Sequence, residues 1–128
     1  LYGVGFDGVF CGESMFSRVP DASKVALAWL VAALRRAGAH LLDCQFMTSH
    51  LESMGAQEIT QARYLQLLKR AQRVAAGLGL AEAEGDGAGE AAPLSLPEGF
   101  AALLADAAAA GASSSPGNFI AQSLTQTS

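Results

Sequence analysis

Apolar and polar residues alternate at the start of the chain, as they do in a β-strand. In residues 1–11 (LYGVGFDGVFC), aromatic and β-branched side chains occupy every second position up to Phe6. The pair Asp7-Gly8 separates this run from a second one that starts at Val9. Asp-Gly between two strand-like runs predicts a hairpin turn, so we expect two antiparallel strands here.

The segment 12–18 (GESMFSR) follows the second run and is predicted to be a loop. It places a carboxylate, two hydroxyl groups and a cation beside two large apolar side chains. In α/β proteins ligands are usually bound where a strand ends and a helix begins. We therefore expect this loop to contact a ligand, although Glu13 pairing with Arg18 or capping the next helix is the alternative.

The clearest helical pattern covers residues 21–37. One broad apolar stripe recurs at helical spacing and consists of Val25, Leu27, Ala28, Leu30, Val31 and Leu34. Asp21 or Ser23 is expected to cap the start of this helix. Gly38 is placed to end it.

The next segments continue the alternation of strands and helices. A short strand is expected at 40–46, a short helix at 47–54 and a brief extended piece at 57–59. A second long helix is expected from Thr60 to about Ala76. This order predicts an α/β layer in which helices pack on a sheet.

The C-terminal part is predicted to contribute little to the core. Residues 77–96 are an acidic, Gly/Ala-rich linker by composition. Residues 97–128 are expected to be a weakly structured extension, with a weak alanine-rich helix at 97–110 and a possible anchor at Phe119. The core of the domain is therefore assigned to residues 1–76.

Composition fits one domain with its own core. The chain has 128 residues, of which 51% are apolar and 16% are charged. Its apolar runs are shorter than the roughly 20 residues that span a membrane, and no membrane partner is expected. Cys11 and Cys44 lack the spacing of a metal or disulfide framework, so we expect no metal and a reducing, cytoplasmic setting. The chain starts at Leu1 inside a predicted strand, and we expect it to be the C-terminal part of a longer protein.

Charge divides the chain into two unlike parts. Residues 1–75 contain all eight Lys and Arg residues and six acidic residues, whereas residues 76–128 contain six acidic residues and no basic one. Only the first part is suited to face a polyanion.

Asp43 and Gln45 share one face of the strand expected at 40–46, because positions i and i+2 of a strand point to the same side. One interpretation is that both face solvent while Leu42, Cys44 and Phe46 face the core. The other is that the aspartate orients the glutamine at a strand end beside the first loop. The pattern leaves both open.

Several short segments occur in a specific order: LYGV at 1–4, FCGESMFSR at 10–18, DASK at 21–24, LDCQ at 42–45, HL at 50–51, GA at 55–56, EI at 58–59 and RY at 63–64. Taken together they resemble the leucyl/phenylalanyl-tRNA–protein transferases over roughly half of the chain. The GESMFSR segment and the Asp-Cys-Gln triplet are the most specific of them.

The resemblance implies a fold and an activity. It implies the catalytic C-terminal domain of such an enzyme, with a GNAT-like acetyltransferase fold in which a mixed sheet is flanked by helices. A smaller N-terminal domain is expected to precede it. The implied enzyme moves Leu, Phe or Met from an aminoacyl-tRNA to the N-terminal Lys or Arg of a protein and so marks that protein for degradation. Its expected partners are Leu-tRNA, Phe-tRNA and such proteins, without a cofactor.

The resemblance also implies roles for individual residues. Gln45 is expected beside the attacking amine and polarised by Asp43, while Glu13 is expected to hold the α-amino group of the aminoacyl moiety. The aminoacyl side chain is expected in an apolar pocket formed by Leu1, Met15, Leu27, Leu30 and Leu34, with Gly12 at its floor. Basic residues of the second long helix are candidates for phosphate contacts with tRNA, namely Arg63, Lys69, Arg70 and Arg73. A solvated helix face is the alternative for these four.

Two other classes of function compete with this interpretation. An acetyl-CoA-dependent N-acetyltransferase shares the implied fold, but such enzymes carry a glycine-rich pyrophosphate loop before a helix. The corresponding residues 18–21 read Arg-Val-Pro-Asp and contain no glycine. A non-catalytic interaction domain explains each residue singly but does not explain the ordered set of segments.

Overall fold

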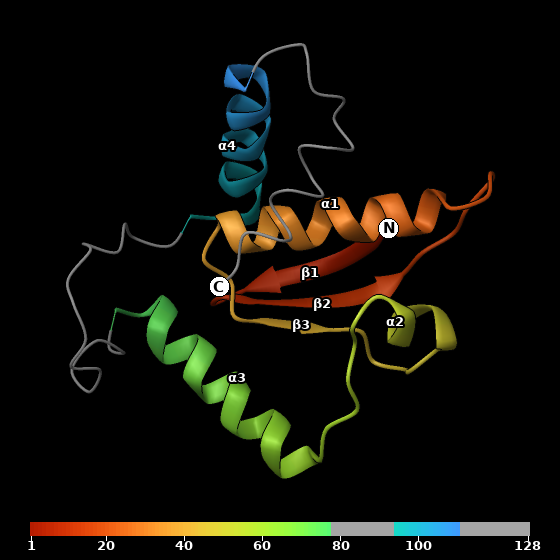
Figure 1. Cartoon of the computed structure of the whole chain (residues 1–128). Coiled ribbons are helices and arrows are strands. Elements are labelled where there is room, and N and C mark those ends of the chain that lie inside the picture. Colours follow the sequence, from red (N-terminus) through yellow and green to blue (C-terminus); the bar gives the residue numbers. More distant parts are fainter. Residues whose placement is uncertain (78–93, 111–128) are drawn as a thin grey trace. The chain divides into compact units, whose positions relative to one another are not determined.

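The computed structural model describes residues 1–77 and 94–110, and its elements form an α/β chain (Figure 1). The elements in chain order are β1 (Tyr2–Phe6), β2 (Val9–Ser14), α1 (Ala22–Arg36), β3 (Leu41–Asp43), α2 (Ser49–Ser53), α3 (Gln61–Ala75) and α4 (Leu96–Ala109). The predictions for 78–93 and for the anchor at Phe119 lie outside the described residues. None of the described helices is long and apolar enough to cross a bilayer.

The described chain divides into two compact units. The sheet unit contains Tyr2–Ser14 and the described residues from Ala39 to Gly77, and thus all three strands with α2 and α3. The helical unit contains Leu1, Met15–Gly38 and the described residues from Leu94 onward, and thus α1 and α4. These unit boundaries differ from the sequence boundaries expected above.

The sheet is mixed and has the order β1-β2-β3. Strands β1 and β2 are antiparallel, and β2 and β3 are parallel, with Cys11 opposite Asp43. The predicted hairpin is confirmed: Asp7 and Gly8 form its turn with φ angles of 43° and 73°. Positive φ at both central residues is the geometry of a type I′ turn, which follows the twist of the strands. The expectation of an α/β chain with a mixed sheet is therefore confirmed.

The prediction of a loop from residue 12 is wrong in its first part, because β2 continues to Ser14. Gly12 pairs with Gly3 and Ser14 pairs with Tyr2, with an irregularity in register between them. These pairings bind backbone groups of Gly12 and Ser14 into the ladder, and pairing with a neighbouring strand outweighs the low strand propensity of glycine. Glu13 consequently lies on a strand.

The predicted strand at 40–46 is too long, since β3 ends at Asp43. Gln45 has a φ angle of 61° and therefore lies outside the extended region. The same-face argument for positions 43 and 45 is thus wrong. The extended piece predicted at 57–59 forms neither a strand nor a helix.

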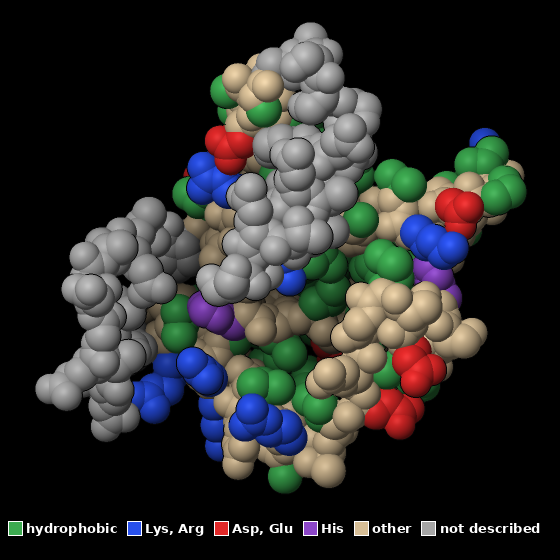
Figure 2. Space-filling view, viewed as in Figure 1, with side chains coloured by type: hydrophobic (Ala, Val, Ile, Leu, Met, Phe, Trp, Pro, Cys, Tyr) green, Lys and Arg blue, Asp and Glu red, His purple; other side chains and the backbone are tan. Residues whose placement is uncertain are grey.

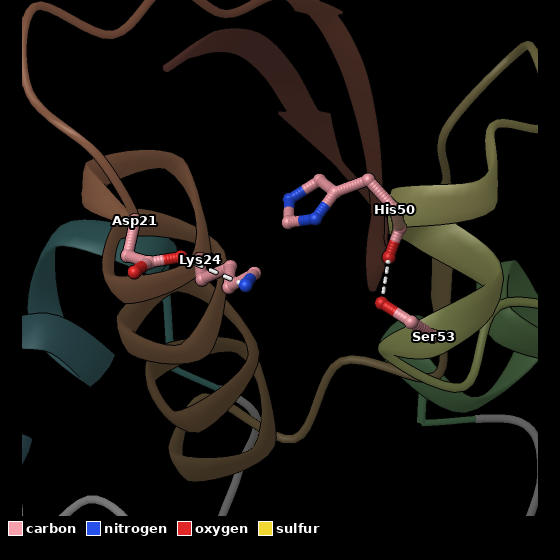
Figure 3. A network of polar contacts seen from close by, with 4 residues as sticks. All are labelled: Asp21, Lys24, His50 and Ser53. Carbon is pink, nitrogen blue, oxygen red and sulfur yellow. Dashed lines mark hydrogen bonds and ion pairs between the residues drawn. The ribbon is translucent and has the colours of Figure 1, made fainter.

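Helices α2 and α3 lie within the ranges that the sequence predicts for them. Thr48 and Thr60 cap α2 and α3, accepting hydrogen bonds from the backbone N–H of Leu51 (3.1 Å) and Arg63 (3.3 Å). Gly55, with φ of 93°, follows α2. Within α2 the Ser53 hydroxyl donates to the His50 carbonyl at 2.7 Å (Figure 3).

The helical unit is held together by α1 and α4. Leu103 of α4 is buried with Ala32 and Ala33 of α1. Gly99 allows the close approach, because a Cβ there would lie 2.9 Å from the Ala33 carbonyl oxygen. The alanine-rich helix predicted at 97–110 is thus confirmed; it starts with a capping box at Ser95.

The start of α1 differs from the capping prediction. Asp21 occupies the N-cap position with φ of 61°, and its side chain makes no capping hydrogen bond. It forms an ion pair with Lys24 at 2.7 Å instead (Figure 3). At the other end, the backbone N–H of Gly38 bonds to the Arg35 carbonyl, and φ of Gly38 is 77°. The predicted stop at Gly38 is confirmed.

Candidate functional site

Three of the candidate catalytic residues lie together in the sheet unit. Glu13 is near the end of β2, Asp43 is the last residue of β3, and Gln45 follows two residues later. Because β2 and β3 are parallel and Cys11 is opposite Asp43, both strands end at the same edge of the sheet. The topology therefore brings residues 32 positions apart into contact.

A tight turn after β3 orients Gln45. One carboxylate oxygen of Asp43, Oδ1, accepts the backbone N–H of Gln45 at 2.8 Å. A hydrogen bond from an aspartate side chain to the backbone two residues on is an Asx-turn, and it accommodates the left-handed φ of Gln45. Asp43 thus acts on the backbone of Gln45, whereas the partner of the side-chain amide is Glu13.

The Glu13 contact determines which way the Gln45 amide points. Gln45 Nε2 donates to Glu13 Oε1 at 3.1 Å, and both residues are exposed. An ionised carboxylate only accepts hydrogen bonds, so the amide nitrogen must face Glu13. The Gln45 carbonyl oxygen is then directed elsewhere and is able to accept a hydrogen bond from a ligand. The expected alternatives for Glu13, a pair with Arg18 or a helix cap, are not formed within the described residues.

Asp43 also influences groups on neighbouring elements. A side-chain hydrogen bond with Asp43 is the largest cause that raises the pKa of Tyr64, and partial burial adds to it. The pKa of Cys44 is raised by burial first and by the Asp43 charge second, and the pKa of Cys11 is raised by burial and by Asp43 and Glu13. Both cysteines are free thiols. These shifts all favour the protonated form of the phenol and of the two thiols.

The turn lines a cavity of about 520 Å³ that belongs entirely to the sheet unit. Its wall is formed by Leu41, Leu42, Asp43, Cys44, Gln45, Phe46, Met47, Leu51, Ala56, Gln57, Glu58, Ile59, Gln61 and Tyr64. Two of these residues, Asp43 and Glu58, are acidic and none is Lys or Arg. The cavity therefore combines an apolar wall with negative charge.

The expected aminoacyl pocket is divided between the two units. Gly12 belongs to the sheet unit, and the other five residues belong to the helical unit: Leu1, Met15, Leu27, Leu30 and Leu34. The three leucines of α1 are buried, whereas Leu1 and Met15 are 44% and 36% exposed. A Cβ at Gly12 would meet only the Asp43 backbone oxygen, at 3.5 Å. There is thus room beside the backbone of β2 at this position.

The four basic candidates lie on the exposed face of α3. At 100° per residue they fall within an arc of about 120°, together with Gln66. The opposite face carries the buried Ala71 and contacts β2 and β3. Figure 2 shows Lys and Arg side chains gathered over this helix. The residues concerned are Arg63, Lys69, Arg70 and Arg73.

Sequence reasoning missed two residues of this region, Tyr64 and Glu58. Tyr64 lies in the helix predicted from Thr60, and its hydroxyl was the signal that it needs a polar partner when half-buried. Glu58 follows no periodic pattern, so only the fold places it at the cavity. Among the described residues, no group of three or more His, Cys, Asp or Glu side chains is arranged to hold a metal ion.

Fold and site define an α/β protein with a Glu-Gln-Asp cluster where two parallel strands end. Comparison with known proteins gives the family. Residues 1–69 match the leucyl/phenylalanyl-tRNA protein transferase family. The chain belongs to this family.

Relatives with the name leucyl/phenylalanyl-tRNA–protein transferase occur in several bacteria. The protein of Novosphingobium aromaticivorans is 64% identical over 100% of this chain and 53% of its own length. The protein of Rhizorhabdus wittichii is 60% identical over 63% of this chain and 33% of its own length. The chain thus spans about half the length, or less, of these relatives. No solved structure matches it.

Proposed function

We propose that this chain is the catalytic part of an enzyme that moves Leu, Phe or Met from aminoacyl-tRNA to the N-terminal Lys or Arg of acceptor proteins, marking them for degradation. Membership of the family supports the reaction class. The observation that carries the proposal is the hydrogen bond from the Gln45 side-chain amide to Glu13, together with the bond from the Gln45 backbone N–H to Asp43.

The reaction requires positioning more than activation. The ester that links the amino acid to tRNA is already activated, and the α-amine of the acceptor attacks its carbonyl carbon. An amide bond forms, the bond to the ribose oxygen breaks, and one proton passes from the amine to that oxygen. Aligning amine and ester is the larger part of such catalysis, and assistance to the proton transfer adds to it.

Each residue of the cluster has a role in this proposal. The Gln45 carbonyl oxygen accepts an N–H of the attacking amine and directs its lone pair at the ester. A glutamine amide does not ionise near neutral pH, so the charge that favours proton loss comes from Asp43. Glu13 binds Gln45 through Oε1, and its second oxygen is available for the α-ammonium group of the aminoacyl moiety.

The aminoacyl side chain is proposed to enter an apolar pocket whose residues are Leu1, Gly12, Met15, Leu27, Leu30 and Leu34. Aliphatic side chains suit an unbranched or γ-branched substrate. One methylene is worth only about 1–3 kcal/mol in such a pocket, so discrimination between Leu and Phe is expected to be modest.

The acceptor is proposed to present a cationic N-terminal residue to the cavity beside Gln45. The Asp43 and Glu58 carboxylates and the lack of Lys or Arg among its lining residues support this choice. A positively charged side chain gains from both carboxylates, whereas an acidic one is repelled.

The tRNA is proposed to bind along α3 through its phosphates. The four exposed Lys and Arg residues on one face of α3 support contact with phosphates that does not depend on the tRNA sequence. The double substitution Lys69→Glu with Arg73→Glu is expected to weaken tRNA binding strongly at low salt. The matched control, Arg18→Glu with Arg35→Glu, makes the same change in net charge at residues that do not belong to α3. Equal tRNA affinity for the α3 variant and the control contradicts this part of the proposal.

We propose that the chain has a GNAT-like acetyltransferase fold. The mixed sheet with its flanking helices is the part of a GNAT-like fold that the described residues support. A cytoplasmic setting without metal or cofactor follows from the proposed substrates.

The experiment that tests the function is transfer of labelled Leu or Phe from charged tRNA to a peptide with N-terminal Arg, using the full-length protein. The expected result is labelled peptide, and a matched peptide with N-terminal Glu is expected to remain unlabelled. No transfer to either peptide, together with calorimetric binding of acetyl-CoA, would favour an N-acetyltransferase. No transfer and no binding would favour an interaction domain.

A further inference from the structure

Phe46 and Ile59 are exposed apolar residues of the cavity beside Gln45. Phe46 directly follows Gln45, and Ile59 directly follows Glu58. The side chains of Phe46 and Ile59 are 79% and 43% exposed, and both line the cavity. Covering such apolar surface with a ligand is favourable. Apolar wall therefore adjoins each of the polar groups that the proposed function assigns to the first residue of the acceptor.

The cavity is larger than a single side chain requires. Its volume of about 520 Å³ lies within the range of about 300–1,000 Å³ that is typical of pockets for drug-sized ligands. One Lys or Arg side chain is smaller than such a ligand and leaves part of the cavity unfilled. The remaining space is able to take a further residue of the acceptor.

One wall of the cavity consists of backbone without a partner in the described fold. Residues 56–60 form no helix, strand or turn, and Thr60 at the end of this segment has an extended backbone. Among the described residues, no backbone group of Gln57, Glu58 or Ile59 takes part in a hydrogen bond. All three residues are exposed. Unpaired backbone groups of this kind bind the main chain of a peptide when it adds alongside them as a strand.

We propose that this cavity holds the first two residues of the acceptor and favours an apolar side chain at the second position. The second side chain lies against Phe46 and Ile59, and the acceptor main chain runs along residues 57–59 and bonds to their N–H and C=O groups. The inference rests on the proposed transfer reaction and extends the acceptor beyond its N-terminal Lys or Arg. Charge supports a peptide with a cationic end as the occupant, because the lining includes Asp43 and Glu58 and neither Lys nor Arg.

The first test compares two acceptor peptides that begin with Arg-Leu and Arg-Asn, in transfer from Leu-tRNA by the full-length protein. Leu and Asn side chains are similar in size and differ in polarity. We expect KM for the Arg-Leu peptide to be about tenfold lower, close to the least that full burial of a leucine side chain contributes. We expect kcat to be the same for both peptides, because a contact that is equal in the ground state and the transition state changes KM alone. Equal KM values for the two peptides overturn the inference.

Variants of the full-length protein locate this preference. Phe46→Ala and Ile59→Ala each remove part of the apolar wall and are expected to reduce the ratio of the two KM values. Phe16→Ala is the matched control, because Phe16 is 77% exposed and does not line the cavity. This control is expected to keep the ratio. The inference is overturned if neither cavity variant reduces the ratio, or if Phe16→Ala reduces it equally.

Hydrogen exchange tests the main-chain contact in the absence of transfer. When the Arg-Leu peptide is added to the full-length protein without tRNA, we expect slower exchange of a backbone N–H within residues 57–59, because hydrogen-bonded amides are protected. Unchanged exchange at saturating peptide contradicts the main-chain pairing. Failure of the wild-type protein to transfer Leu to either peptide would instead refute the proposed function, so the two failures are distinguishable.

Discussion

The left-handed backbone of Gln45 predicts an unusual order of stability for two substitutions. Gln45→Gly and Gln45→Ala both remove the side-chain amide and its hydrogen bond to Glu13. They differ only in the Cβ, which at φ of 61° costs about 1–2 kcal/mol for any residue other than glycine. We therefore expect the Gln45→Gly variant to be more stable than the Gln45→Ala variant by about 1 kcal/mol, after part of the gain is offset by the greater freedom of glycine in the unfolded chain.

Position 66 provides the matched control. Gln66 is exposed in the middle of α3, where glycine is less favourable than alanine by about 1 kcal/mol. Gln66→Gly is therefore expected to be less stable than Gln66→Ala, the reverse of the order at position 45. Urea unfolding followed by circular dichroism measures both differences. If alanine is as stable as glycine at position 45, the turn is not left-handed in solution and the proposed aim of the amide is refuted.

Three further predictions concern other parts of the chain. Gly12→Ala is expected to change the free energy of unfolding by less than about 0.5 kcal/mol, because the added methyl group meets only ordinary van der Waals contacts. The same variant is expected to slow transfer, because the methyl group occupies space proposed for the aminoacyl group. An unchanged transfer rate excludes Gly12 from the pocket. Gly99→Ala is expected to lower the free energy of unfolding, measured in urea, by about 1–3 kcal/mol, although alanine has the better helix propensity. The reason is that a Cβ at position 99 would lie 2.9 Å from the Ala33 carbonyl oxygen. A more stable variant would mean that α1 and α4 do not pack closely. Iodoacetamide is expected to alkylate Cys44 at pH 8.5 more slowly in the folded protein than in urea, because burial and the Asp43 charge raise its pKa above the usual 9.0. The rate, followed by peptide mass spectrometry, should rise in the Asp43→Asn variant, and no change would show that the carboxylate does not act on the thiol.

Local signals predicted most of the elements. The Asp7-Gly8 turn, the helix start at Thr60 and the Gly38 stop each depend on local preferences of one or two residues, and all three are confirmed. Strand ends were less predictable. Glu13 lies on a strand because its neighbours pair with β1, and such pairing is a property of the sheet rather than of the segment.

The candidate site was predictable only in its residue types. The resemblance identified Glu13, Asp43 and Gln45, but their contacts depend on a parallel pairing that no local pattern specifies. Gln45 was expected on a strand, and the Asx-turn that removes it from the strand requires the Asp43 side chain to replace a ladder partner. The place of Tyr64 at the cavity was not predicted, because a tyrosine in an amphipathic helix is compatible with simple packing.

The central claim is that Glu13 and Gln45 act together on the aminoacyl group and the attacking amine. The most direct measurement is the transfer rate of full-length protein saturated with Leu-tRNA and an N-terminal Arg peptide, for wild type, Glu13→Ala, Gln45→Ala and the double variant. We predict a fall of at least about tenfold in kcat for each single variant, equivalent to about 1.4 kcal/mol of transition-state stabilisation, and a double variant much less impaired than the product of the two effects. Full activity in either single variant, with the wild type active in the same assay, would contradict the account.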